Sequence, residues 1–243
     1  MARRNLHYYL ILVLLIFCYT GFSEAIGPVS IDSVNFKRIE HKKIRKLISM
    51  QKDFGVKTFD EIHPACYNVP DSLDFRTFEK SQLIRQDEDV VWQHLVHQSP
   101  NDEFDGRIVT FGLLYSKKNH TLMYHNDSST GIEEGQLLFF NLRLLRGIKN
   151  LAVALEVTRV DNENKEFEYC YVDHGDTKGT QKFSLRPTPD GFTELTQVTK
   201  YHCKSRLRDR RLYSFFHEQI VKEFFTAIKK KCESGKESIA VGL

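Results

Sequence analysis

The stretch from Gly191 to Cys232 most constrains what this chain can fold into. Its first part, GFTELTQVTKYHC, has the composition of a β-strand, and its second part, RLRDRRLYSFFHEQIVKEFFTAIKKKC, predicts one long helix. Apolar residues recur in that helix at spacings of three and four and give it one wide apolar face: Leu212, Phe215, Phe216, Ile220, Val221, Phe224, Phe225 and Ile228. Burying one such side chain contributes roughly 1.5–3 kcal/mol, so the helix must pack on a large apolar surface.

The chain upstream of this stretch predicts short strands joined by turns. Strands are expected over 73–84, 107–116, 120–127, 134–145, 149–160, 166–173 and 180–187, and one helix over 87–97. The turns are short and contain Gly, Asn and Asp, so neighbouring strands run antiparallel. We therefore predict an α+β fold in which a curved antiparallel sheet of seven or eight strands wraps around the long C-terminal helix.

The N-terminus has the organisation of a secretory signal peptide. Two arginines precede an apolar run from Tyr8 to Phe22, and Ser23 and Ala25 are small residues at the spacing of a cleavage site. The apolar run is short of the ~20 residues that a membrane-spanning helix needs. Cleavage after Ala25 would give a secreted or periplasmic protein.

The rest of the chain is predicted to have three parts. A polar helical lead-in occupies 26–70, one folded domain occupies 71–233, and a flexible tail occupies 234–243. The lead-in contains a predicted helix over 32–52 with an interrupted apolar stripe and many basic residues. Two interpretations of this helix remain open: a solvated basic face, or a surface that makes peripheral contact with an anionic membrane.

The charge balance gives no argument for a nucleic-acid partner. The chain has 35 Lys and Arg against 32 Asp and Glu, a formal net charge of +3, which is small without a concentrated basic patch. The densest basic cluster, KSRLRDRR over 204–211, opens the long helix, where arginines oppose the helix dipole. It is either solvated charge or a site for an acidic headgroup, with Arg206 and Arg208 as the candidate residues.

Two segments carry a family resemblance. FEKSQLIRQDEDVVWQHLVH is similar to the first strand and following helix of the START-like helix-grip (SRPBCC) superfamily, which includes polyketide cyclases and lipid-transfer domains. KGTQKFSLRPTPDGFTELTQVTKY is similar to the final hairpin of that superfamily, and the resemblance covers about Leu73 to Cys232. It implies a helix-grip fold, antiparallel pairing of the first and last strands, and a ligand cavity under the terminal helix.

Export also bears on the cysteines. Cys66, Cys170, Cys203 and Cys232 remain after signal cleavage, an even number for an oxidising compartment, and none forms the CxxC pattern of a zinc site. The resemblance places the residues before Leu73 near the end of the last strand, which implies a disulfide between Cys66 and Cys203. Cys170 lies in mid-strand and is expected to be a buried thiol.

Alternation along the strands suggests which side chains line the cavity. Phe167, Tyr169 and Tyr171 share one strand face, and Gln197, Thr199 and Tyr201 share another. With the geometry that the resemblance implies, the predicted ligand-binding residues are Tyr115, Tyr124, Tyr169, Tyr171, Tyr201, Phe216, Arg206 and Arg208. The same rings would equally suit a filled core.

We expect an exported protein that binds a hydrophobic or amphipathic small molecule, such as a lipid or polyketide. One alternative is a cyclase- or hydrolase-like enzyme of the same fold, which would need Asp173, His174 and Asp176 to point into the cavity, although these residues also suit a turn. The other alternative is a secreted interaction protein with a closed core. The sequence contains no cofactor or metal fingerprint, so neither group is expected, and it leaves the oligomeric state open.

Overall fold

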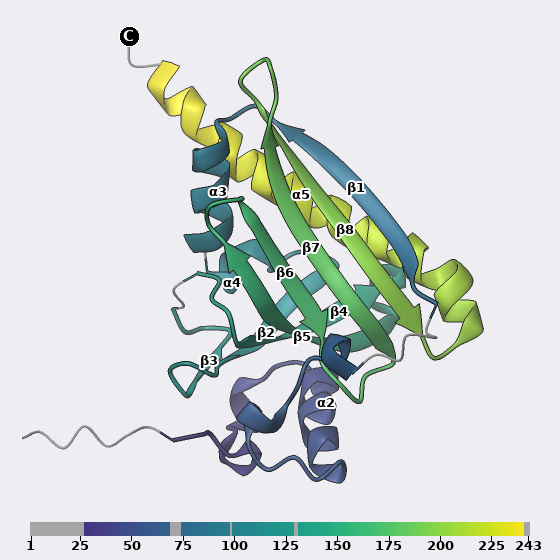
Figure 1. Cartoon of the computed structure of the whole chain (residues 1–243). Coiled ribbons are helices and arrows are strands. Elements are labelled where there is room, and N and C mark those ends of the chain that lie inside the picture. Colours follow the sequence, from purple (N-terminus) through teal and green to yellow (C-terminus); the bar gives the residue numbers. More distant parts are fainter. Residues whose placement is uncertain (1–26, 69–73, 98, 129–130, 241–243) are drawn as a thin grey trace, which may run out of the picture.

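A computed structural model describes residues 27–68, 74–97, 99–128 and 131–240, so the predicted signal peptide lies outside the described residues. One antiparallel sheet of eight strands, in the order β1-β8-β7-β6-β5-β4-β2-β3, curves around a long C-terminal helix (Figure 1). The predicted α+β helix-grip fold is therefore confirmed. The first and last strands are antiparallel neighbours as expected, with Arg76 of β1 opposite Tyr201 of β8.

The strands agree with the predicted ones to within a few residues at each end. They are β1 (Arg76–Ile84), β2 (Val109–Ser116), β3 (Thr121–Tyr124), β4 (Gln136–Leu144), β5 (Lys149–Asp161), β6 (Glu166–Tyr171), β7 (Thr177–Pro187) and β8 (Thr193–Cys203).

The helices differ more from the prediction. They are α2 (Lys42–Asp53), α3 (Glu88–His97), α4 (Pro100–Glu103) and α5 (Tyr213–Ala240), with a π-helical turn η6 (Arg208–Leu212) before α5 and the 3₁₀ turns η1 (Ile31–Ser33), η2 (Phe36–Arg38), η3 (Phe59–Glu61), η4 (Ala65–Asn68) and η5 (Leu145–Gly147). The lead-in helix starts at Lys42 rather than Asp32, because Ser30 and Asn35 cap η1 and η2 ahead of it. Helix α5 continues to Ala240, beyond the predicted end at Cys232.

The inner face of the sheet packs against α5 and α3. Alternate residues of β6, among them Phe167 and Tyr169, point to this face and join one apolar cluster with Phe225 and Ile228 of α5. Phe215 lies between Tyr213 and His217 on the helix and points away from the sheet, so it is 59% exposed although its spacing had placed it on the apolar face.

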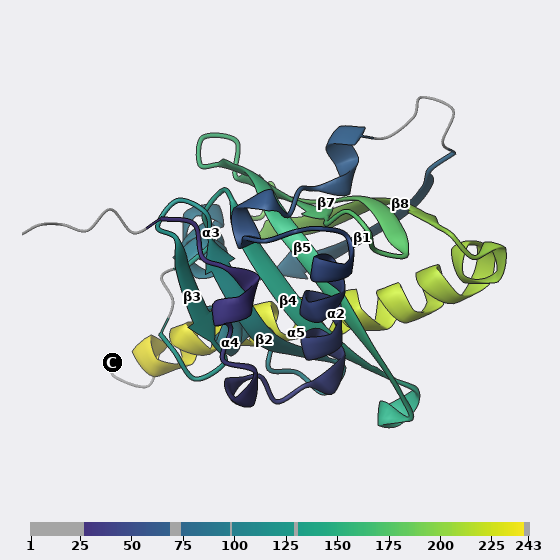
Figure 2. The same ribbon diagram turned by 90° about the horizontal axis from the view of Figure 1, so that it is seen from below.

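The lead-in covers the outer face of the sheet. Helix α2 lies across β4 and β5 (Figure 2), and Ile44 and Ile48 are fully buried in a second apolar cluster. A Cβ atom at Gly112 would lie 2.3 Å from the Ile44 side chain, so the glycine at the bulge in β2 permits this approach. The helix therefore does more than present a solvated basic face, because its apolar stripe packs on the sheet.

The predicted disulfide between Cys66 and Cys203 is wrong, because Cys66 is bonded to Cys170. The residues around Cys66 reach the end of β6, where the Asp173 N–H donates to the His63 carbonyl at 2.8 Å. Cys170 points to the outer face, where the lead-in lies, whereas Cys203 is a buried free thiol in the inner cluster. A disulfide from Cys66 on the outer face therefore cannot reach Cys203, whose side chain lies on the inner face.

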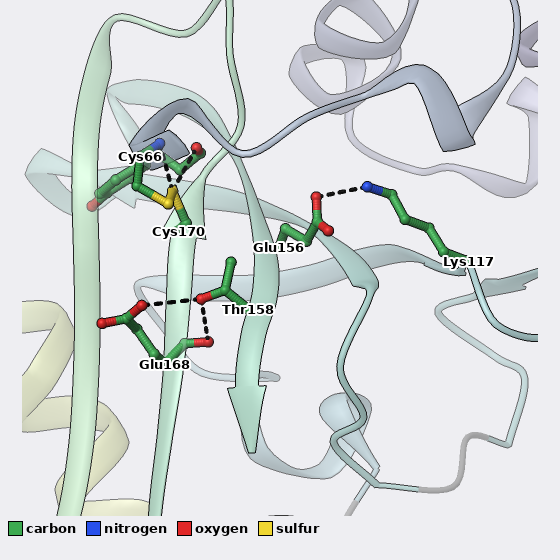
Figure 3. The surroundings of a disulfide bond; sticks show 7 residues. Cys66, Lys117, Glu156, Thr158, Glu168 and Cys170 are labelled. Carbon is green, nitrogen blue, oxygen red and sulfur yellow. Dashed lines mark hydrogen bonds and ion pairs between the residues drawn. A yellow bond between two sulfur atoms is a disulfide. The ribbon is translucent and has the colours of Figure 1, made fainter. Parts of the chain in front are cut away.

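A lysine paired with a glutamate near the disulfide also holds the lead-in on the sheet. Lys117 Nζ lies 2.8 Å from Glu156 Oε2 (Figure 3) and donates to the Ile62 carbonyl at 2.8 Å. Burial raises the pKa of Glu156, and the neighbouring Lys117 opposes this shift. The lead-in is therefore attached through a covalent bond, a hydrogen bond from the paired Lys117 and an apolar cluster.

Loss of the disulfide is expected to destabilise the protein strongly. It joins residues 104 apart in sequence, and closing a loop of ~100 residues contributes roughly 4–5 kcal/mol in the chain-entropy model. The Cys66→Ser/Cys170→Ser variant should lose about that much free energy of unfolding in urea titrations. Cys203→Ser is the control and should retain the Cys66–Cys170 peptide on a non-reducing map. A map that links Cys66 to Cys203 would contradict the structure.

Candidate ligand-binding site

A cavity of about 360 Å³ lies between the inner face of the sheet and α5. Its walls come from β4 to β8, from η6 and from one side of α5, and most of the side chains are apolar. Small-molecule sites in proteins typically enclose roughly 300–1,000 Å³ and are lined mainly by apolar and aromatic side chains. The cavity therefore has the size and composition of a ligand site.

Phenylalanine rings form one end of this cavity. The Phe104 ring stacks on Phe224 with centroids 5.1 Å apart and lies 4.8 Å from Phe140. Phe183 meets Phe224 edge to face at 5.5 Å. These rings form a surface suited to an apolar group.

Glu223 also lines the cavity, but its carboxylate serves the protein backbone. It accepts hydrogen bonds from the N–H groups of Arg107, Ile108 and Val109 at 3.0, 2.8 and 3.1 Å. A Cβ atom at Gly106 would overlap this carboxylate, so the glycine leaves room for it. Glu223 therefore shapes the wall of the cavity rather than offering a charge to a ligand.

Hydrogen-bonded polar side chains line another part of the cavity. Gln197 Nε2 donates to Gln181 Oε1 at 2.9 Å, Gln181 Nε2 donates to Tyr171 Oη at 2.9 Å, and the Tyr171 and Tyr213 hydroxyls lie 2.6 Å apart. Burial raises the pKa of Tyr171 to about 12 and also raises that of Tyr213, so both hydroxyls are neutral near pH 7. Gln197 Oε1 is buried and accepts no hydrogen bond from any described residue.

His217 adds a buried imidazole to the wall that α5 contributes. Its Nε2 lies 2.9 Å from Thr199 Oγ1, and its ring meets Phe78 edge to face at 5.0 Å. Burial lowers the pKa of His217 to about 3, because no acidic side chain among the described residues compensates for the lost hydration of the imidazolium. The ring is therefore neutral at physiological pH.

The stability of the fold should fall on acidification because of His217. The unfolded chain binds a proton at this residue below its ordinary pKa of 6.5, whereas the folded chain does so only near pH 3. The free energy of unfolding should therefore decrease by up to about 1.4 kcal/mol per pH unit between about pH 6 and pH 3. Urea titrations across this range should show a shallower decrease for His217→Gln. An equal slope in both proteins would contradict the burial of a neutral imidazole.

Half of the predicted ligand-binding residues line the cavity. Tyr169, Tyr171, Phe216 and Arg208 are among its lining residues. Tyr201 is buried behind Tyr213, on which its ring stacks at 3.8 Å, and its hydroxyl lies 2.6 Å from Ser214 Oγ. Arg206 is exposed and lies outside the lining.

Tyr115 and Tyr124 lie on the outer face and attach the lead-in. The Tyr115 hydroxyl donates to Asp60, and its burial together with this contact raises the pKa of Tyr115. The Tyr124 hydroxyl accepts a hydrogen bond from the Asn35 N–H at 2.9 Å, and Arg38 lies over its ring. The prediction that these two rings line the cavity is corrected, because the outer face is covered by chain that the prediction had left unplaced.

Sequence reasoning did not assign Gln181, Gln197, Tyr213 and His217 to the ligand site, although they line the cavity. Signals for two of them were present. Gln197 shares a strand face with Tyr201, and His217 lies four residues from both Tyr213 and Val221 on the apolar side of the helix. A polar residue at a position where the period requires an apolar one indicates a functional or fully hydrogen-bonded site.

The residues of the enzyme hypothesis lie outside the cavity. Asp173, His174 and Asp176 belong to the turn between β6 and β7 and are absent from the lining. His174 stacks on Phe54 of the lead-in at 4.1 Å, and Asp176 pairs with Arg208 at 3.2 Å. The condition for that hypothesis, side chains directed into the cavity, is not met.

Within the described part of the chain, no group of three or more His, Cys, Asp or Glu side chains could hold a metal ion. None of its helices has the length and apolarity to cross a membrane.

Comparisons with known proteins concern the fold. No family model matches the sequence, and no curated protein matches it. Similar solved structures include Ara h 8.0201, with 15% identity and a TM-score of 0.47 over 66% of this chain and 99% of that chain. Norcoclaurine synthase from Thalictrum flavum in complex with dopamine and hydroxybenzaldehyde has 14% identity and a TM-score of 0.48 over 66% and 88% of the two chains. Major latex-like protein 151 from Panax ginseng has 11% identity and a TM-score of 0.45 over 66% and 97%.

The identities and TM-scores of these structures are too low to support an argument about this chain. The strand order and α5 show the helix-grip arrangement independently of any comparison. At such low identities the similarity does not extend to activity.

Proposed function

We propose that this protein binds a hydrophobic or amphipathic small molecule in the cavity between the sheet and α5. The observation that carries the proposal is the unfilled volume of about 360 Å³ within the main apolar cluster. Protein interiors are close-packed, and voids larger than a water molecule are few. A space of this size is therefore better explained as a ligand site than as a packing defect, and this favours binding over an interaction protein with a closed core.

The distribution of polar groups suggests how a ligand is oriented. The phenylalanine end, with Phe104 and Phe224, suits an apolar body, whereas Gln197 Oε1 can accept a hydrogen bond. A buried acceptor that makes no hydrogen bond costs roughly 1–3 kcal/mol, and a ligand hydroxyl or amine would remove that cost. An amphipathic molecule therefore fits the cavity better than a pure hydrocarbon.

Filling the cavity should abolish binding without unfolding the protein. Ile220 lines the cavity from α5, and the neighbouring Gln219 is exposed. Ile220→Trp should weaken the uptake of N-phenyl-1-naphthylamine, a neutral fluorescent probe, by about tenfold or more, since the added ring occupies the ligand volume. The affinity for 1-dodecanol, measured by displacement of the probe, should fall in parallel. The matched variant Gln219→Trp should bind both molecules as the parent does.

Circular dichroism and thermal melting would show that both variants remain folded. Absence of probe binding by the parent protein, or undiminished binding by a folded Ile220→Trp variant, would refute a ligand site in this cavity.

We also propose that the chain is exported and cleaved after Ala25. The disulfide between Cys66 and Cys170 supports this, because such bonds persist in oxidising compartments. N-terminal sequencing of the protein purified from its own cells should begin at Ile26. A mature chain that retains the apolar run from Tyr8 to Phe22 would contradict the proposal.

A further inference from the structure

A second hollow lies on the outer face of the sheet, between α2 and β5. This groove has a volume of about 370 Å³. Basic side chains from three separate parts of the chain line it: Lys43 and Lys46 of α2, Lys149 of β5, and Lys204 and Arg208 near η6. Of the described residues in its lining, only Asp176 is acidic.

The positive charge of the groove is not neutralised within the described structure. Asp176 already pairs with Arg208, at 3.2 Å between Oδ2 and Nη1. None of the four lysines forms an ion pair with a described residue. Cations gathered around a concave surface raise the local potential and attract an anion, and Lys and Arg are the usual partners of phosphate and carboxylate groups.

The groove and the cavity share lining residues where the sheet is incomplete. Tyr171, Thr177 and Arg208 line both hollows, as do Lys149, Leu151 and Val153 at the start of β5. Strand β6 ends at Tyr171 and pairs with β5 only from Leu155 onward, with one further hydrogen bond from Val172 N–H to the Ala154 carbonyl. The start of β5 therefore has no described strand beside it on that side, and the two hollows share this part of their lining.

We propose that the groove holds the phosphate or carboxylate headgroup of an anionic amphiphile whose apolar part lies in the cavity. The inference rests on the proposed function and specifies its ligand class. The hydrogen-bonded series Gln197, Gln181 and Tyr171 runs along the cavity wall to the shared lining, where Arg208 Nη2 donates to Thr177 Oγ1 at 2.9 Å. Lys43 and Lys46 come from the lead-in, which lies outside the region of family resemblance, so the headgroup site is an addition to the shared fold.

Three probes distinguish the contribution of the apolar tail to binding from that of the anionic headgroup. Dodecyl phosphate carries both tail and headgroup, 1-dodecanol carries the tail alone, and inorganic phosphate carries the headgroup alone. Dodecyl phosphate is titrated below its micelle-forming concentration. We expect the parent protein to bind dodecyl phosphate about tenfold or more tightly than 1-dodecanol, and to bind inorganic phosphate more weakly than either.

Charge reversal in the groove provides the test. Lys43→Glu/Lys46→Glu should weaken dodecyl phosphate binding by about tenfold or more and leave 1-dodecanol binding within about twofold. Lys43→Gln/Lys46→Gln should give a smaller loss in the same direction. The control Lys222→Glu/Lys230→Glu makes the same change in net charge at exposed positions of α5, outside both hollows, and should leave both affinities unchanged.

Each contrary result has a separate meaning. If 1-dodecanol binds but dodecyl phosphate is insensitive to both groove variants, the headgroup site is refuted while the cavity proposal stands. If neither 1-dodecanol nor dodecyl phosphate binds, the proposed function itself fails. If inorganic phosphate binds as tightly as dodecyl phosphate, and equally well in Ile220→Trp, the groove is a free-phosphate site and the amphiphile proposal is overturned.

Discussion

Both faces of one curved sheet are apolar, and the rest of the structure follows from the need to remove both from water. Helix α5 covers the inner face with Phe225 and Ile228, and the lead-in covers the outer face with Ile44 and Ile48. Burial of each such side chain contributes roughly 1.5–3 kcal/mol. The two covers differ: the lead-in is also attached by a disulfide, whereas the space between α5 and the sheet contains a ligand-sized cavity.

Local periodicity was sufficient to predict the strands, α3, α5 and the fold class. It could not show which face of the sheet a distant segment covers, because that choice depends on the summed packing of the whole lead-in. This explains why Cys66 was assigned to Cys203 instead of Cys170. It also explains the position of Tyr115, since the bulge between Phe111 and Leu113 changes the face to which successive residues of β2 point.

The polar residues of the cavity were only partly predictable. Alternation placed Gln197 on a face with Tyr201, and helical spacing placed His217 among apolar residues, but neither pattern shows whether the surrounding space is filled. That depends on the distance between α5 and a curved sheet, which no short segment determines. The basic groove was even harder to predict from the sequence, because Lys43, Lys149 and Lys204 are far apart along the chain. They become neighbours only through the position of α2. Of the two arginines proposed for a headgroup, Arg208 faces the groove and Arg206 does not.

Native mass spectrometry of the purified protein mixed with a lipid extract tests most directly whether the space between the sheet and α5 admits a ligand. An open cavity predicts a complex of one protein and one ligand, with a discrete added mass that disappears after solvent extraction and returns when the extract is added again. A single mass equal to that of the protein alone, under all of these conditions, would contradict an open cavity and would show that α5 covers a closed core.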